Sequence, residues 1–80
     1  MQRDNLRDLI ERWVRRTGST KGRLAKLIGV HRTRLYPWME GQSQPETEHL
    51  EALAEVLGER LSVVAAAIDE SRRQREAVGA

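Results

Sequence analysis

The chain has 80 residues, a net charge of +2 and no cysteine. This length allows one domain with a core of a few packed helices, and an enclosed substrate pocket would compete with that core for inward side chains. Without cysteine, neither a disulfide nor a thiolate zinc site can stabilise the fold. The sequence has no apolar run long enough to cross a bilayer and no signal-peptide core, so we expect a cytoplasmic protein without a membrane partner.

The charge is distributed unevenly along the chain. Residues 1–45 hold ten Lys or Arg against four acidic residues, whereas residues 46–80 hold four Arg against eight acidic residues. No carboxylate occurs between Arg12 and Met39. This asymmetry predicts one basic and one acidic face, which is typical of a protein that binds a polyanion, although a charge run alone equally fits a solvated surface.

The first predicted helix covers residues 5–17. Its apolar residues recur at the spacing of a single helical stripe and are Leu6, Leu9, Ile10, Trp13 and Val14. Either Asp4 or Asn5 can cap its first turn, and Gly18 can supply a left-handed stop.

Two short helices are predicted next, over residues 21–28 and 32–40. Thr20 is the expected N-cap of the first, and its inward-facing residues are expected to be Leu24, Ala25, Leu27 and Ile28. Gly29 separates the two helices, because the break needs a residue free to take a positive φ. Pro37 lies within the second helix and cannot donate to the carbonyl four residues earlier, so we expect this helix to be kinked or tightened.

A fourth helix is predicted over residues 47–57. Its apolar residues are Leu50, Leu53, Ala54, Val56 and Leu57. Thr47 is a better N-cap candidate than Glu46, because hydroxyl side chains cap helices more effectively than Glu. Gly58 is its expected stop.

A fifth helix is predicted over residues 62–73. One face of this helix can cover the core through Val64, Ala67 and Ile68. Residues 72–80 have no periodic apolar face and are expected to form a flexible tail. The sequence therefore predicts an all-α architecture of five helices, with the domain covering residues 1–71.

The two short helices satisfy the requirements of a helix-turn-helix. A small residue is needed where the second helix crosses the first, and Ala25 meets that need. Apolar side chains must hold the pair together from behind, and they fall on Leu24, Ile28, Val30, Leu35 and Trp38. The residues left facing outward on the second helix are Arg32, Thr33, Tyr36 and Pro37, with Arg34 on its flank. In a helix-turn-helix that binds DNA, the outward face of the second helix enters the major groove.

A family resemblance is carried by the segments LAKLIGVHRTRLYPWMEG and, after Pro45, HLEALAEVLG. Together they resemble the DNA-binding domain of the Cro/C1-type, lambda-repressor-like regulators. The matching positions are Lys21, Leu24, Ala25, Gly29, Val30, Leu35, Trp38, Gly41, Pro45 and Leu50 to Ala54. The resemblance spans roughly residues 5–68, and the chain departs from it at Met39, where the family often has Glu.

The resemblance implies a compact fold that binds duplex DNA in a sequence-specific manner. We expect a bacterial or phage transcriptional regulator, a repressor that locates to the nucleoid and reads a pseudo-palindromic operator with its third helix. In the family the start of this helix reads base edges, a role that falls here on His31, Arg32, Thr33 and Arg34, with Pro37 one turn later, although Arg34 better fits a phosphate contact. The expected phosphate contacts are Lys21, Arg23, Arg34, Tyr36, Gln42, Ser43 and Gln44.

Alternatives remain open at each base-reading position. Arg32 is the best candidate for direct readout because Arg pairs with guanine O6 and N7, but it could instead contact phosphate or solvent. Thr33 could bond a base, touch a thymine methyl group or help to cap the helix. His31 could act as a weak cap or touch phosphate.

The resemblance also implies a two-fold homodimer. The residues expected at its interface lie on the fifth helix and are Val63, Val64, Ala66 and Ala67, with Val63 and Ala66 left partly outside the core. The alternative is that the whole apolar run belongs to the core of a monomer.

Other functions find little support in the sequence. A metal site would need Glu46 or Glu48 to converge on a histidine, so we expect no metal, and likewise no cofactor and no small-molecule substrate. No nucleophile–base pair or phosphate-binding glycine loop occurs, so we do not expect an enzyme. The second hypothesis is an antitoxin or partner-binding regulator that uses the same fold mainly for protein–protein interaction, although the basic stretch favours DNA.

Overall fold

The structure, a computed structural model, describes residues 3–79 and is all-helical over that range. The α-helices and one short 3-10 helix, η1, are α1 Leu6–Thr17, α2 Lys21–Ile28, η1 Arg32–Arg34, α3 Leu35–Met39, α4 Thr47–Leu57 and α5 Leu61–Gly79. The predicted all-α architecture of five α-helices is confirmed. Within the described range, no helix is long and apolar enough to span a membrane.

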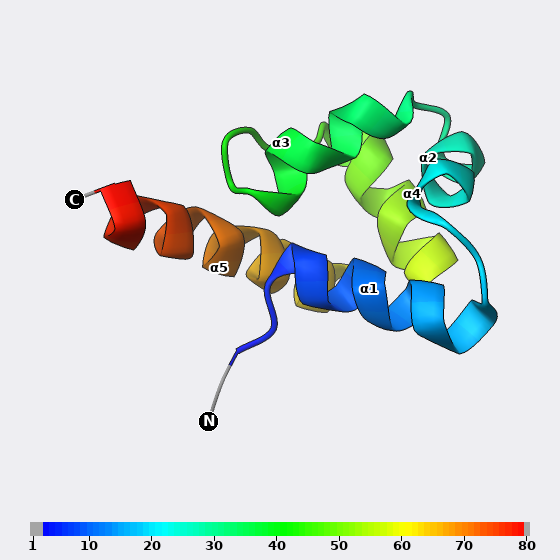
Figure 1. The fold of residues 1–80 in the computed structure, drawn as a ribbon, viewed down its shortest axis with the longest axis horizontal. Helices are drawn as coiled ribbons and strands as arrows, with labels where there is room; N and C mark the ends of the chain where they lie inside the picture. Colours follow the sequence, from blue (N-terminus) through cyan, green and yellow to red (C-terminus); the bar gives the residue numbers. More distant parts are fainter. Residues whose placement is uncertain (1–2, 80) are drawn as a thin grey trace.

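The helices surround a single core. α1 and α5 lie side by side, and α2 and α3 lie on the opposite side of the molecule (Figure 1). α4 packs against helices of both groups, and α5 also packs against α3. The largest fully buried side chains between them are Trp38, Leu6, Ile10, Leu24, Leu35, Leu53, Leu57 and Val64.

Two of the three predicted N-cap residues cap their helices in the structure. Asn5 caps α1 in a reciprocal capping box, in which Asn5 Oδ1 accepts from the Asp8 amide at 2.9 Å and Asp8 Oδ2 accepts from the Asn5 amide at 3.0 Å. Thr20 caps α2 by accepting from the Arg23 amide at 3.1 Å. Both caps satisfy backbone N–H groups that have no partner within the helix.

The predicted N-cap of α4 is wrong. Glu46, not Thr47, is the N-cap residue, and its side chain makes no capping hydrogen bond. The reason is that the Leu50 amide donates to the Glu46 carbonyl at 2.9 Å, which makes Thr47 the first helical residue. The acidic side chains of Glu46 and Glu48 are therefore left to stabilise the helix start through its dipole.

One inward-facing residue of α2 was also predicted wrongly. Leu24, Ala25 and Ile28 are buried as expected, but Leu27 is 51% exposed. Residues three and four positions apart share one face of a helix, and those three occupy the only face that this short helix turns to the core. Leu27 therefore projects beside that face into solvent.

The C-terminal helix extends further than predicted. α5 continues to Gly79 instead of ending near residue 73, so residues 72–79 are helical where a flexible tail was expected. Tertiary hydrogen bonds hold this part of the helix: Ser71 Oγ, which is buried, accepts from the Leu6 amide at 3.0 Å, and Asn5 Nδ2 donates to Gln74 Oε1 at 2.6 Å. Two ion pairs between residues three apart add local support. The expected domain and tail also include residues 1, 2 and 80, which lie outside the described residues.

The loop after α3 rests directly on the backbone of α5. Gly41 has a φ of +75°, and a Cβ atom at this position would lie 2.5 Å from the carbonyl oxygen of Ser71. Only glycine satisfies both demands, because a side chain is strained at this φ and would overlap the neighbouring backbone. The contact fixes where α3 ends relative to α5.

We expect Gly41→Ala to destabilise the fold more than Gly18→Ala. Both positions have positive φ, but a Cβ at Gly18 meets no atom within 4 Å, so that variant should lose only about 1 kcal/mol of unfolding free energy. The backbone overlap at Gly41 should add about 1–3 kcal/mol to this loss. Urea denaturation followed by circular dichroism measures both variants, and equal losses would contradict the close approach of the loop to α5.

Candidate nucleic-acid interface

A tight turn joins α2 to the segment formed by η1 and α3. Gly29 takes the left-handed conformation with a φ of 82°, and its amide donates to the Lys26 carbonyl at 3.2 Å. The Val30 amide donates to the Ala25 carbonyl at 2.9 Å, which closes the end of α2. The predicted break at this glycine is confirmed.

The apolar contacts behind the turn are also confirmed. Ala25, where the two helices cross, is 1% exposed. The residues expected to hold the helix pair together all pack into the core: Leu24, Ile28, Leu35 and Trp38 are buried, and Val30 is half-buried against them. Their burial leaves the opposite side of η1 and α3 facing solvent.

The second helix begins as a tightened turn. η1 forms first, with the Arg34 amide donating to the His31 carbonyl at 2.9 Å, and regular α-helix starts only at Leu35. This agrees with the tightening predicted from Pro37, which has no N–H to donate to the first turn. The Pro37 carbonyl in turn accepts from the Gln42 amide at 2.8 Å, so the loop after α3 is tied back to this helix.

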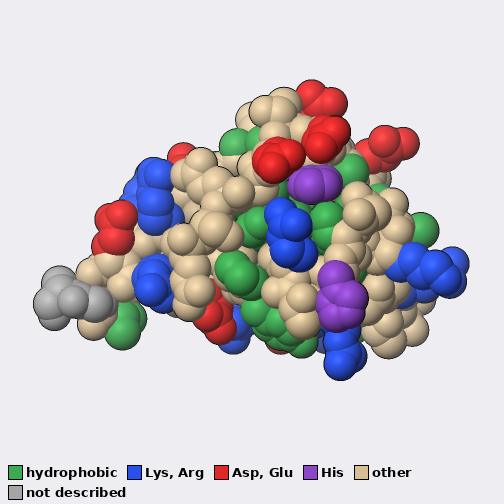
Figure 2. Space-filling model, turned by 90° about the horizontal axis from the view of Figure 1, so that it is seen from above, with side chains coloured by type: hydrophobic (Ala, Val, Ile, Leu, Met, Phe, Trp, Pro, Cys, Tyr) green, Lys and Arg blue, Asp and Glu red, His purple; other side chains and the backbone are tan. Residues whose placement is uncertain are grey.

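Most residues predicted to contact DNA are exposed on the α2–α3 side of the molecule. Among the expected base readers, His31, Arg32 and Thr33 are exposed and Pro37 is half-buried. Among the expected phosphate contacts, Lys21 is half-buried and the exposed ones are Arg23, Arg34, Tyr36, Gln42, Ser43 and Gln44. Figure 2 looks onto this side, where Lys and Arg side chains and both histidines are visible and a group of acidic side chains lies at the top of the view, beside one histidine.

Four cations of this surface have no acidic partner among the described residues. Within residues 3–79, no carboxylate lies within 4.0 Å of the charged groups of Lys21, Arg23, Arg32 and Arg34. Arg12, by contrast, pairs with Asp4 at 2.9 Å, and the hydrogen bond and charge of Asp4 raise the pKa of Arg12. The cations on the helix-turn-helix are therefore available to an external anion.

Arg34 is held in place by an aromatic ring. Its guanidinium carbon lies 5.8 Å from the centroid of the Trp38 ring, within the range of a cation–π contact. The buried Trp38 thus positions a cation at the edge of the segment formed by η1 and α3. The sequence placed Arg34 on the flank of the helix but did not reveal this contact, because it depends on the side-chain direction of Trp38.

His31 caps η1 through its side chain. Its Nδ1 accepts from the Thr33 amide at 3.3 Å and lies 2.9 Å from Thr33 Oγ1. Of the two residues that the sequence offered as possible caps, His31 therefore takes this role. His31 and Thr33, two of the candidate base readers, are therefore joined by hydrogen bonds.

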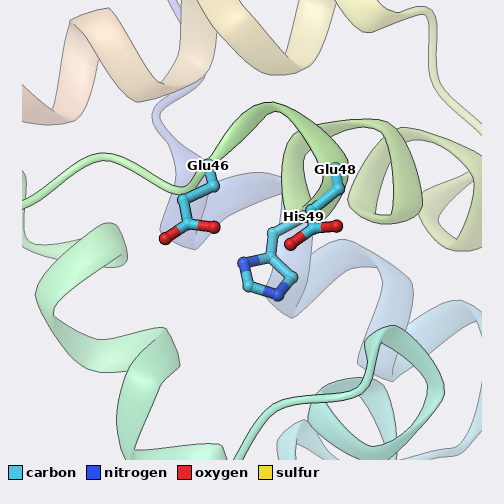
Figure 3. Close-up of side chains that lie close together, drawn as sticks. All are labelled: Glu46, Glu48 and His49. Atoms are coloured by element: carbon cyan, nitrogen blue, oxygen red, sulfur yellow. The ribbon is translucent and has the colours of Figure 1, made fainter.

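Three residues of metal-ligand type meet at the start of α4. Glu46, Glu48 and His49 each offer one ligand atom, and these atoms lie within 4.8 Å of one another (Figure 3). His49 packs on Trp38 with ring centroids 5.7 Å apart, and its buried Nδ1 has no hydrogen-bond partner among the described residues. The convergence that a metal site requires is therefore present, although the positive end of the α4 dipole favours the two carboxylates themselves and opposes a bound cation.

The expected dimer residues divide into two groups. Val63 is 38% exposed and Ala66 is also exposed, whereas Val64 and Ala67 are buried in the core of the single chain. A contact with a second copy would therefore be made by Val63 and Ala66. Leu61 at the start of α5 is 43% exposed and was not singled out from the sequence, since it lies outside the apolar run.

The turn, the buried contacts behind it and the exposed second helix define a helix-turn-helix domain. A helix-turn-helix family model matches residues 15–64 of the chain. No curated protein and no solved structure gave a significant match. The chain belongs to the Cro/C1-type helix-turn-helix family, a family of DNA-binding transcription regulators that are not typically enzymes.

Proposed function

We propose that this protein is a transcriptional repressor that binds a pseudo-palindromic operator by placing η1 and α3 in the DNA major groove. The observation that carries the proposal is that Arg23, Arg32 and Arg34 are exposed around the α2–η1 turn and have no carboxylate partner within the described residues. Cations arranged this way on a helix-turn-helix suit the phosphates that border the major groove. Such a protein would act in the cytoplasm, on the nucleoid.

The proposed contacts divide into base reading and phosphate binding. Arg32, exposed in the first turn, would pair with the O6 and N7 atoms of a guanine, and Thr33 and His31 would act beside it. Pro37 has no N–H and would contribute apolar contact alone. The phosphate contacts would come from Lys21, Arg23, Arg34, Tyr36, Gln42, Ser43 and Gln44.

Dimerisation through α5 would complete the interface. Val63 and Ala66 are small enough to allow two copies of the helix to approach closely, and both are exposed. A two-fold dimer doubles the phosphate contacts and presents two recognition segments, each formed by η1 and α3, about 34 Å apart, one turn of the DNA helix. This would match a palindrome with half-sites one turn apart.

The first test is a binding series on an operator selected from random duplexes. We expect log K to fall linearly with log salt concentration, because phosphate contacts release counterions. Arg32→Ala should weaken operator binding by about 1–3 kcal/mol and should weaken non-specific binding less. Arg75→Ala removes the same charge from an exposed position on α5 and serves as the matched control.

Each outcome of this series bears on the function. A loss with Arg32→Ala that is equal for operator and random duplex would make Arg32 a phosphate contact. Duplex binding that is undetectable or insensitive to salt would contradict DNA recognition and would favour the antitoxin or partner-binding function.

The dimer is tested by Val63→Asp, which places a charge on the proposed α5 contact. We expect sedimentation analysis to find a dimer for the wild type and a monomer for the variant, because an unpaired carboxylate is costly to bury. Ser62→Asp adds the same charge at the neighbouring exposed position and should remain dimeric. A wild-type chain that stays monomeric at high concentration would rule out this interface.

A further inference from the structure

We infer that His31 determines which bases Thr33 selects: the imidazole accepts a hydrogen bond from the hydroxyl of Thr33, which leaves the lone pairs of Thr33 Oγ1 to accept from the amino group of adenine or cytosine. The inference rests on the proposed function, since it assigns a selectivity to the same DNA-reading surface. It depends on the hydrogen bonds between these two side chains and not on any bound ligand.

The geometry determines the direction of the hydrogen bonds. Nδ1 of His31 lies 3.3 Å from the Thr33 amide nitrogen and 2.9 Å from Thr33 Oγ1. A backbone N–H can only donate, so Nδ1 must be the acceptor and the proton of the neutral ring must lie on Nε2. The hydroxyl must then donate to the same Nδ1, because that atom has no proton to give.

This arrangement removes one of the two roles of the hydroxyl. A free threonine hydroxyl can donate or accept, but the O–H of Thr33 already donates to His31, and only the oxygen lone pairs remain for a base. In the major groove, adenine N6 and cytosine N4 are donors, whereas guanine O6 and thymine O4 are acceptors. Thr33 would therefore favour adenine or cytosine on the strand that it contacts and would disfavour guanine or thymine.

The backbone of η1 supports this preorganisation. The His31 carbonyl accepts from the Arg34 amide at 2.9 Å, so the imidazole and the hydroxyl are carried by a hydrogen-bonded turn. Both side chains are exposed, and no core packing orients the hydroxyl. The imidazole therefore orients it before DNA arrives, which reduces the conformational entropy lost on binding.

The first experiment uses the free protein and needs no DNA. Long-range ¹⁵N correlation spectra of the full chain, at a pH where the His31 ring is neutral, identify which ring nitrogen carries the proton. We expect the Nε2–H tautomer in the wild type, with an unprotonated Nδ1. A proton on Nδ1 would overturn the inference, whether or not the protein binds DNA.

The second experiment removes the amino group from the base. The selected operator is searched for the position whose base preference changes in Thr33→Val, a variant of the same shape without the hydroxyl. There, adenine is replaced by purine, or cytosine by 2-pyrimidinone, each of which lacks the exocyclic amine. We expect wild-type affinity to fall about 3- to 10-fold, the worth of one net hydrogen bond, and Thr33→Val to be indifferent to the replacement.

The role of His31 is tested on the same duplexes. His31→Ala should lose most of the dependence on the amine and should bind duplexes with guanine or thymine at that position nearly as well. His31→Asn should retain the wild-type pattern, because its side-chain oxygen can accept the same two donors. Measured at the same pH as the spectra, where the ring is neutral, the salt dependence should be the same in all variants, since no charge is removed.

The results distinguish this inference from the proposed function. If the wild type enriches no duplex sequence, the proposed function fails and the inference fails with it. If an operator is enriched but its Thr33-dependent position prefers guanine or thymine, only the inference fails. The same holds if no position depends on Thr33, or if His31→Ala keeps the full dependence on the amine.

Discussion

The recognition segment is too short to hold its own shape. η1 and α3 together run only from Arg32 to Met39, and isolated helices of this length are not stable in water. Their conformation depends on the burial of Leu35, Trp38 and Met39, which are at most 3% exposed. The free energy of burying these side chains against α2 and the rest of the core therefore fixes the direction of the exposed face. The surface that we propose for DNA binding therefore depends on the core packed behind it.

Trp38 links that core to the surface at two points. Its ring is buried, yet Arg34 lies over it and His49 packs against it. Arg34 belongs to the proposed DNA surface, whereas His49 joins the acidic pair at the start of α4. Trp38 therefore lies between Arg34, which suits a phosphate, and the carboxylates at the start of α4, which repel one. These carboxylates would limit how far bound DNA could extend toward α4.

α5 contacts both the start of α1 and the loop that follows α3. The buried hydroxyl of Ser71 accepts from the first residue of α1, and the carbonyl of the same Ser71 lies against Gly41 in the loop that follows α3. The position of the recognition segment is therefore set relative to α5, the helix that would carry the dimer contact. This connection gives a physical reason why two recognition segments in a dimer would keep a fixed spacing.

The sequence by itself determined the features that depend on neighbours along the chain. The apolar stripe of α1, the caps at Asn5 and Thr20, the left-handed Gly29 and the tightening caused by Pro37 are all local, because backbone geometry and helix periodicity decide them. Tertiary structure alone decided the exposure of Leu27, the extension of α5, the meeting of Glu46 with His49, and the contact of Arg34 with Trp38. These depend on which surfaces pack together and how side chains are directed. The hydrogen bonds between His31 and Thr33 lie between these groups: the sequence offered both residues as caps, but only the geometry of the turn showed that the His31 side chain takes the role.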